Sequence, residues 1–301
     1  MNAVIREYQE GDIQRISKFY LNLFEKGIKS NGLKCAWECF SKHPCFSDFR
    51  PEEFGIWEAN GEIVGIVILE SPWNGTVFID LEPLYWEIYG DIIDYAERHF
   101  SGTDEMGKKY LNVRTLKTNK ALHEILKLRE YTEAPNDSVV AYSLCDSLIL
   151  SQTIEKGFQI KSLEEVYDFN KLNILLWNAF DYEGDPPDYY DDVNPLIKHA
   201  WLEYQRDICT VILAPDDSYA AFCGMWFDED TLEVFLEPLV TDEKYRNLGL
   251  AKACVYSSLQ KCKEIGAKYV YAEPDNSALG FYKKIGFRDK VREEIIWKKL
   301  L

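Results

Sequence analysis

The sequence predicts an α/β fold made of two similar halves, each a mixed, mostly antiparallel sheet flanked by helices. Three observations support this prediction. Strand-like and helix-like segments alternate along the second half, short motifs recur in the same order in both halves, and one strand leads into a helix that opens on small residues. With 301 residues, of which 47% are hydrophobic, the chain is long enough for two domains with packed cores.

The expected elements of the second half follow one another at ordinary spacing. A strand at 157–160 precedes a helix at 162–180, whose apolar residues recur at helical spacing. A loop at 181–192 contains a glycine and two prolines, and a helix follows from Asn194 to about Arg206. The remaining elements are three strands, a helix, a strand, a short helix and a last strand in the same sheet, at 209–213, 219–226, 231–240, 249–265, 268–273, 277–285 and 291–297.

Two pairs of short motifs relate the halves. Glu82–Leu84 repeats as Glu237–Leu239, and Asn119–Leu122 has a counterpart in Asn276–Leu279. The first members lie 37 residues apart in one half (82 to 119) and 39 in the other (237 to 276), so the offsets between the halves, 155 and 157 residues, differ by only two. We therefore predict a tandem duplication.

The segment Tyr245–Ala253, directly after the strand-like run at 232–240, has features of an anion site. The first turn of a helix leaves backbone N–H groups without intrahelical partners and carries the positive end of the helix dipole. Gly249 and Ala251 would allow a ligand to approach the backbone closely, and Arg246 adds a charged donor. A phosphate or pyrophosphate is therefore the expected ligand.

The motif Arg-x-x-Gly-x-Ala at Arg246–Ala251, followed by the Asn-to-Phe pattern at 276–287, resembles the Gcn5-related N-acetyltransferase (GNAT) superfamily from about Gly157 onward. The resemblance implies an acyltransferase that uses acetyl-CoA or a related short acyl-CoA. It further implies that the loop wraps the CoA pyrophosphate and that the preceding strand splays to pair with the pantetheine arm. The cofactor-binding residues implied in this way are Leu239, Val240, Arg246, Asn247, Leu248, Gly249, Leu250, Ala251 and Asn276.

The two copies differ where a phosphate would bind. In place of Tyr245–Gly249 the first half has Glu87–Asp94, which contains no arginine and whose acidic side chains would repel a pyrophosphate. Position 282, a tyrosine, aligns with Ile125 in the first half. The whole chain thus resembles a tandem GNAT protein, an arrangement with a parallel in mycothiol-synthase-type proteins, and its N-terminal copy is expected not to bind CoA.

Acyl transfer to an amine requires a base, because a free amine is mostly protonated at neutral pH. Glu237, on the strand before the loop, is the first candidate and would act through water. Glu233 lies four residues back and is expected on the same side of the strand. Alternatively, these carboxylates only face solvent or orient the substrate.

Three further positions have proposed roles in the second half. Tyr282 is the candidate general acid toward the CoA thiolate, or a packing residue whose hydroxyl contacts CoA. A splay at Pro238 would free the N–H groups of Leu239 and Val240 for the pantetheine arm and the thioester carbonyl, unless both remain in ordinary ladder pairing. Asn276 would bond the pantetheine arm or cap the short helix.

The loop at 181–192 carries six acidic residues and three tyrosines. The resemblance places the acceptor site near this segment, and an acidic, aromatic loop suits a cationic amine. A solvated loop without a binding role is the alternative.

Metal binding is not expected. Cys35, Cys39, His43 and Cys45 have zinc-compatible side chains, but their spacing matches no familiar zinc pattern.

The net charge of −17 argues against nucleic acid or an anionic membrane surface as a partner. The N-terminus has no apolar signal region and no run of apolar residues approaches membrane-spanning length, so a cytoplasmic location is expected. The eight cysteines are then expected to be reduced thiols.

Together these observations predict a domain at 148–301 that transfers an acetyl group from acetyl-CoA to a primary amine by direct attack in a ternary complex. A degenerate copy at 1–147 would be structural or form a wall of the substrate cleft. The alternative is a non-catalytic module that binds acyl-CoA or a partner protein. Polyamines, aminoglycosides, amino acids, peptide N-termini and protein lysines all remain open as acceptors, as does the oligomeric state.

Overall fold

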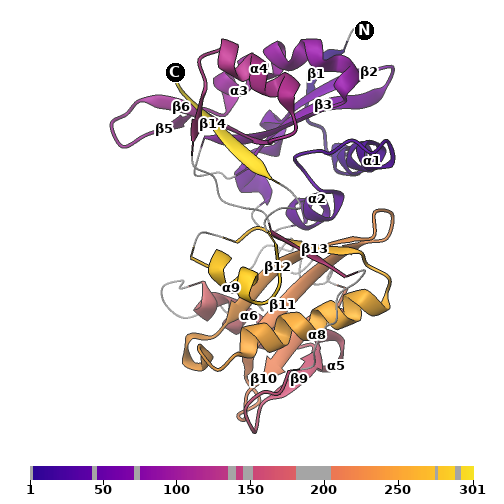
Figure 1. Cartoon of the computed structure of the whole chain (residues 1–301), viewed down its shortest axis with the longest axis vertical. Helices are drawn as coiled ribbons and strands as arrows, with labels where there is room; N and C mark the ends of the chain where they lie inside the picture. Colours follow the sequence, from indigo (N-terminus) through magenta and orange to yellow (C-terminus); the bar gives the residue numbers. More distant parts are fainter. Residues whose placement is uncertain are drawn as a thin grey trace.

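The computed structural model describes residues 3–42, 46–70, 75–134, 140–144, 152–180, 205–274, 277–288 and 293–301. These residues form two sheets, each with helices packed against it, and the two resulting bodies meet around α2 (Lys34–Ser41), as Figure 1 shows. The predicted α/β class with two similar halves is confirmed.

The first sheet has eight strands in the order β1-β2-β3-β4-β6-β14-β7, with β5 paired to β6. Its strands are Val4–Glu7 (β1), Gly55–Ala59 (β2), Glu62–Leu69 (β3), Thr76–Leu81 (β4), Gly102–Thr103 (β5), Lys109–Leu116 (β6), Thr132–Ala134 (β7) and Glu294–Leu300 (β14). The α-helices of this half, besides α2, are Asp12–Glu25 (α1), Tyr89–His99 (α3) and Lys120–Leu128 (α4). Short 3₁₀ helices lie at Phe46–Phe49 (η1), Pro51–Glu53 (η2) and Pro83–Ile88 (η3).

The second sheet has six strands in the order β8-β13-β12-β11-β10-β9. Its strands are Val140–Ser143 (β8), Gln159–Ser162 (β9), Thr210–Leu213 (β10), Tyr219–Asp228 (β11), Glu233–Thr241 (β12) and Tyr269–Ala272 (β13). The helices that accompany it are Leu163–Val166 (α5), Phe169–Ala179 (α6), the 3₁₀ helix Glu243–Tyr245 (η4), Leu250–Glu264 (α8) and Leu279–Lys284 (α9).

The two sheets exchange strands. β14, from the end of the chain, pairs antiparallel with β6 in the first sheet, with Glu294 opposite Leu116 (Figure 1, yellow arrow in the upper body). β8, from the first half of the chain, pairs antiparallel with β13 in the second sheet, with Val140 opposite Ala272. The expectation that the last strand completes the second sheet is therefore wrong. An alternating sequence pattern predicts a strand, but any unpaired sheet edge can accept it.

The strand exchange bears on the predicted boundary between residues 147 and 148. That boundary falls in the segment 145–151, outside the described residues. Because each sheet takes one strand from beyond the boundary, neither sheet forms from one continuous stretch of chain.

One of the repeated motifs occupies different structural positions in the two halves. The last parallel rung between β4 and β6 joins Phe78 to Arg114, and the corresponding rung between β12 and β13 joins Phe235 to Tyr271. β4 ends three residues beyond its rung, at 81, whereas β12 continues for six, to 241. Pro83 therefore opens η3 after its strand, while Pro238 lies inside β12. The halves are related in fold, but Glu82–Leu84 and Glu237–Leu239 are not equivalent.

Helix α2 joins the two bodies. It belongs to the first half of the chain, yet the Cys39 side chain is buried in the core of the second half. Lys34 at its start forms ion pairs with Asp228 and, at 3.2 Å, with Asp230 of the second half. The contact between the halves thus combines apolar packing with paired charges.

The predicted helix at 162–180 is two helices. Ser162 caps α5 in a capping box with Glu165, and Asp168 caps α6 by accepting from the backbone N–H of Lys171. Ser162 therefore starts the first helix, and Asp168, inside the apolar-periodic run, starts a second one.

Within the described part of the chain, no helix combines the length and apolar character needed to span a membrane.

Candidate active site

The strands β12 and β13 diverge after three parallel rungs, the last of which joins Phe235 to Tyr271. Beyond it β12 continues along β11, where Leu239 pairs with Cys223 and Val240 with Phe222. In a ladder, successive residues present their backbone groups to alternate sides. Along the segment 236–241, the backbone N–H and C=O groups of every second residue therefore face β11. Those of the residues between them face the opening beside β13.

A bulge in β11 positions the diverging segment. The register between β11 and β12 shifts between Cys223 and Met225. At the bulge, a Cβ atom on Gly224 would lie 2.4 Å from the carbonyl oxygen of Glu237, so only glycine fits. That carbonyl also accepts a hydrogen bond of 3.0 Å from the Trp226 indole N–H. The Glu237 backbone is thus held from one side by two residues of β11.

The Glu237 carboxyl is a weaker acid than an ordinary glutamate. Partial exclusion of water by the surrounding protein, and secondly the negative charge of Glu273, raise its pKa to about 7. The Glu237 side chain is exposed, so water still reaches the carboxyl and limits the effect of burial. The charge of Glu273 raises the pKa in the same direction. A carboxylate with a pKa near neutrality, reached by water, is suited to act as a base through a water molecule.

Residues of the first half lie close to Glu237. Burial raises the pKa of the Cys39 thiol on α2 well above its ordinary value, and the negative charge of Glu237 is the second largest cause of this rise. Glu273, which influences both groups, forms an ion pair of 3.6 Å with Arg114 on β6. The environment of Glu237 is therefore built by both halves of the chain.

Arg114 is the centre of a buried ionic cluster. Its guanidinium contacts the carboxylates of Glu70 and Glu294 in addition to Glu273. Burial by itself would lower the Arg114 pKa, but the three carboxylates raise it above its usual value, so the residue stays charged. Among the described residues, this one guanidinium thus faces three carboxylates.

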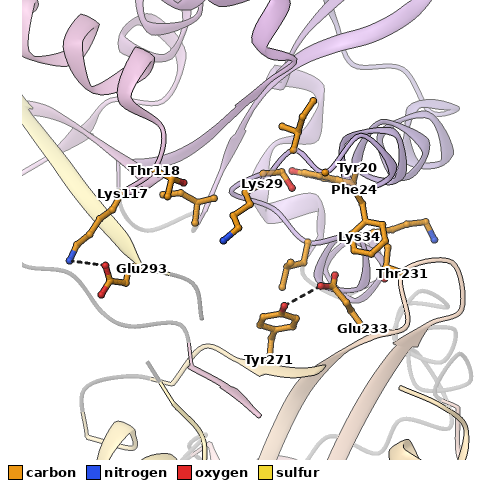
Figure 2. A pocket seen from close by; sticks show the side chains of 15 residues that line it. Tyr20, Phe24, Lys29, Lys34, Lys117, Thr118, Thr231, Glu233, Tyr271 and Glu293 are labelled. Carbon is orange, nitrogen blue, oxygen red and sulfur yellow. Dashed lines mark hydrogen bonds and ion pairs between the residues drawn. The ribbon is translucent and has the colours of Figure 1, made fainter. Parts of the chain in front are cut away.

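Glu233, the second candidate base, lies away from the divergence. Its carboxylate accepts a hydrogen bond of 3.1 Å from the Tyr271 hydroxyl, and the side chain is only 8% exposed (Figure 2). It borders a cavity between the two halves. Four residues of extended strand separate it from Glu237, roughly 13 Å at about 3.3 Å per residue.

The loop between β12 and α8 has an open, exposed backbone. Asp242 caps η4 by accepting from the Lys244 N–H at 3.0 Å. Asn247 and Gly249 have φ of 67° and 76°, and a Cβ atom placed on Gly249 would meet no atom within 4 Å. Left-handed residues next to right-handed ones turn successive N–H groups toward one concave side, which favours anions.

The other residues of this loop that are proposed to bind CoA differ in how exposed their side chains are. Arg246, Asn247 and Leu248 are exposed, and the Arg246 Nε donates to the Thr241 carbonyl oxygen at 3.5 Å. Leu250 is buried at the start of α8, and Ala251 beside it is half-buried. Side chains therefore anchor the helix start while the backbone before it faces solvent.

Tyr282 packs inside the second half. It is 7% exposed on α9, and its ring lies edge-on to Phe281 and Phe287, with centroid distances of 5.4 and 5.2 Å. Asn276, predicted to bond the pantetheine arm or cap this helix, lies outside the described residues, as does the acidic loop at 181–192.

Sequence reasoning missed Arg114 and Glu273. Arg114 stands in the apolar stretch of β6 between Val113 and Thr115, where a charge signals a buried partner. Glu273 follows the last residue of β13, at the sheet edge where sites form in open α/β sheets. Both signals are readable in the sequence, but their meeting across two sheets is not.

The equivalent divergence in the first sheet is closed by the chain itself. Beyond the rung between Phe78 and Arg114, the Asn31 side chain donates to the Ile79 carbonyl oxygen at 2.5 Å and accepts from the Leu116 N–H at 2.7 Å. Asp80 accepts from the backbone N–H of Asn31 as well, at 2.5 Å. Asn31 is 5% exposed. We call this bridging carboxamide the Asn31 plug.

Residues 170–287 match the model of the acetyltransferase (GNAT) family. These residues form a GNAT acetyltransferase domain. It contains the β12–β13 divergence, the exposed loop and Tyr282.

Solved GNAT structures are similar in fold to the whole chain. A GCN5-related N-acetyltransferase from Sphaerobacter thermophilus has 13% sequence identity and a TM-score of 0.60, with 99% of this chain and 95% of that chain covered. A tandem GNAT protein from the clavulanic acid biosynthesis pathway has 8% identity and a TM-score of 0.59, with 99% and 98% covered. A GNAT-family acetyltransferase from Colwellia psychrerythraea has 12% identity and a TM-score of 0.58, with 99% and 100% covered. The chain thus has a tandem GNAT fold; a search of curated proteins finds no match.

In the described ranges, no group of three or more His, Cys, Asp or Glu side chains is arranged to hold a metal ion. Cys35 and Cys39 are buried, and His43 and Cys45 lie outside those ranges.

Proposed function

We propose that the C-terminal half, 148–301, transfers an acetyl group from acetyl-CoA to a primary amine of a small molecule or peptide, in the cytoplasm and without a metal. The observation that carries this proposal is the position of Glu237. Its carboxyl has a pKa of about 7 and lies on the segment of β12 that diverges from β13, just before the exposed loop. A base, an opening between strands and an anion-binding backbone thus follow one another along a single stretch of chain.

In this proposal the cofactor occupies the divergence and the loop. Arg246 and the backbone of Asn247, Leu248 and Gly249 bind the pyrophosphate, with the start of α8 at Leu250 and Ala251 behind them. The backbone groups of 236–241 that face the β13 side, among them those of either Leu239 or Val240, bond the pantetheine arm, with Asn276 beside it. One of these N–H groups also stabilises the oxyanion of the tetrahedral intermediate.

Two side chains move protons. Glu237 takes a proton from the acceptor ammonium through water, so the free amine attacks the thioester carbonyl carbon in a ternary complex. When the carbon–sulfur bond breaks, the departing thiolate receives a proton from Tyr282, and the second proton, which the nitrogen loses on becoming an amide, returns through water to Tyr282. Glu233, buried and held by Tyr271, is the less favoured base of the two.

The N-terminal half, 1–147, supports the reaction from outside the cofactor site. α2 packs on the second half, and Arg114 fixes Glu273 beside Glu237. This half therefore serves as a wall of the acceptor site, in line with the acidic surroundings that a cationic amine requires.

Calorimetric titration with acetyl-CoA tests the cofactor site. We expect one site per chain in the wild type and no measurable binding in Arg246→Glu, because the variant places a negative charge against the pyrophosphate. Arg98→Glu, which reverses an exposed arginine on α3 of the first half, is the matched control and should bind normally. Equal affinity in Arg246→Glu and wild type would contradict the assignment of the loop.

A turnover assay tests the reaction itself. Free thiol released from acetyl-CoA should rise when an accepted amine is added, and the product should be its N-acetyl derivative. Tight acetyl-CoA binding with no turnover across polyamines, aminoglycosides, amino acids and peptides would favour a non-catalytic acyl-CoA-binding module.

A further inference from the structure

A cavity of about 380 Å³ lies between the two halves, apart from the loop assigned to CoA. Its volume falls at the lower end of the range of roughly 300–1,000 Å³ typical of small-molecule sites. The first half contributes the end of α1, the segment 27–34 and the end of β6, while the second half contributes Thr231, Glu233 and Tyr271. Figure 2 shows these side chains around one space.

One wall of the cavity is apolar. Phe24, Ile28, Leu33 and Leu116 line it, and Phe24 remains 43% exposed on a helix whose other large side chains are mostly buried. An exposed phenylalanine beside a cavity offers a surface for an apolar or aromatic group.

The three lysines of the cavity differ in how they are neutralised. Lys34 is paired with Asp228 and Asp230, and Lys117 lies 3.7 Å from Glu293. The Lys29 ammonium forms no hydrogen bond or ion pair with any described residue, and its side chain points into the cavity (Figure 2). Lys29 is therefore the cation available to an anionic group of a ligand.

A carboxylate faces the same space from the other half. Glu233 accepts a hydrogen bond from Tyr271, which orients it, and a carboxylate can accept about four hydrogen bonds in all. An ammonium entering the cavity would form a charge-assisted hydrogen bond with this group.

We propose that this cavity binds a free α-amino acid with an apolar or aromatic side chain. Lys29 binds the carboxylate, Glu233 binds the α-ammonium, and the side chain packs on Phe24, Ile28 and Leu33. A ligand with only one of the two charges forms only one of these two charged contacts, so the site favours the zwitterion. The proposal concerns binding alone and stands whether or not the C-terminal half transfers acetyl groups.

The test is calorimetric titration of the full chain, without acetyl-CoA, with three probes that share a phenyl ring. We expect L-phenylalanine to bind, and phenethylamine and 3-phenylpropionate, which lack the carboxylate and the ammonium respectively, to bind at least tenfold more weakly. L-leucine provides an aliphatic zwitterion of similar charge. Absence of binding by both amino acids, or equal binding of phenylalanine and phenethylamine, would overturn the proposal.

Two variants assign the charges. Lys29→Met should weaken phenylalanine binding about tenfold or more, and the matched control Lys108→Met, at another exposed lysine of the first half, should leave it unchanged. Glu233→Gln keeps an acceptor for Tyr271 but loses the charge, so it should weaken phenylalanine and not 3-phenylpropionate. Wild-type affinity for phenylalanine in Lys29→Met would place the amino acid elsewhere.

Discussion

The two sheets contain the same feature with opposite outcomes. In each, two parallel strands diverge after a final rung, Phe78 to Arg114 in the first sheet and Phe235 to Tyr271 in the second. In the first sheet the Asn31 plug bonds both strands within the divergence. In the second, β12 runs three residues longer past its rung and leads to an exposed loop with two left-handed residues.

We propose that the Asn31 plug excludes a ligand from the first divergence while the fold of this half is kept. A carboxamide has one donor and one acceptor side, so Asn31 satisfies a carbonyl of β4 and an N–H of β6 together. Buried backbone groups need partners, and here the chain supplies them. The first half is then free to act as support for the second.

The largest expected effect is at Glu237, whose counterpart two residues past the rung in the first sheet, Asp80, instead accepts the backbone N–H of Asn31. Glu237→Gln should lower kcat by about 10²–10⁴, because a positioned base contributes that much. In the wild type, kcat/KM should rise with pH through about 7 and then level off, since the deprotonated carboxylate is the active form.

The pH–rate profile is the measurement, with Glu243→Gln, at an exposed glutamate of η4, as the control. A profile that still rises through pH 7 in Glu237→Gln would assign that limb to another group.

The second effect concerns Arg114. This residue belongs to the last rung before the divergence in the first sheet, and it forms an ion pair with Glu273 of the second half. Arg114→Met leaves Glu70, Glu294 and Glu273 without their shared cation, and breaking a buried pair in this way costs about 3–5 kcal/mol in the free energy of unfolding. Denaturant unfolding measures the loss. Loss of the positive charge should also raise the Glu237 pKa further, which moves the pH–rate limb to higher pH. An unmoved limb would show that Arg114 acts on stability only.

A smaller effect is expected at Gly224. Gly224→Ala places a Cβ atom 2.4 Å from the Glu237 carbonyl oxygen, so β12 must shift at a cost of about 1–3 kcal/mol. Acetyl-CoA affinity should fall because the diverging segment moves.

Gly11→Ala is the control for this substitution, since no atom lies within 4 Å of the added Cβ and φ is −74°. Thermal unfolding and calorimetry on both variants separate a local distortion from a general response to alanine.

The smallest effect tests the plug directly. Asn31→Ala leaves the Ile79 carbonyl and the Leu116 N–H without this partner, at a cost of about 1–3 kcal/mol. Acetyl-CoA should still bind at one site per chain, because the first half has the acidic segment 87–94 where the second half has the loop that we propose binds the pyrophosphate. Asn22→Ala on α1 is the control. Two acetyl-CoA sites per chain in Asn31→Ala would mean that the Asn31 plug alone prevents the first half from binding acetyl-CoA.

The order of elements in the second half was predictable because local signals dominate there. The strands at 209–213, 219–226 and 231–240 were found within about two residues, and the helix after the loop ends as expected before Gly266, whose φ is 87°. The residues of the loop were equally readable, since a glycine directly before a helix allows a left-handed backbone that other residues rarely adopt. Long-range partners were not: no local pattern places Arg114 near Glu273 or Cys39 in the opposite core.

By itself the sequence determined the α/β class, the two related halves, the exposed loop before α8 and the absence of such a loop in the first half. Those conclusions rest on periodicity, turn residues and charge, which act over a few residues. Only the tertiary structure decided that β14 and β8 exchange sheets, that Asn31 closes the first divergence and that Arg114 fixes the neighbour of Glu237. Each of these depends on which distant groups satisfy one another's hydrogen bonds and charges, and that choice is made only when the two halves pack together.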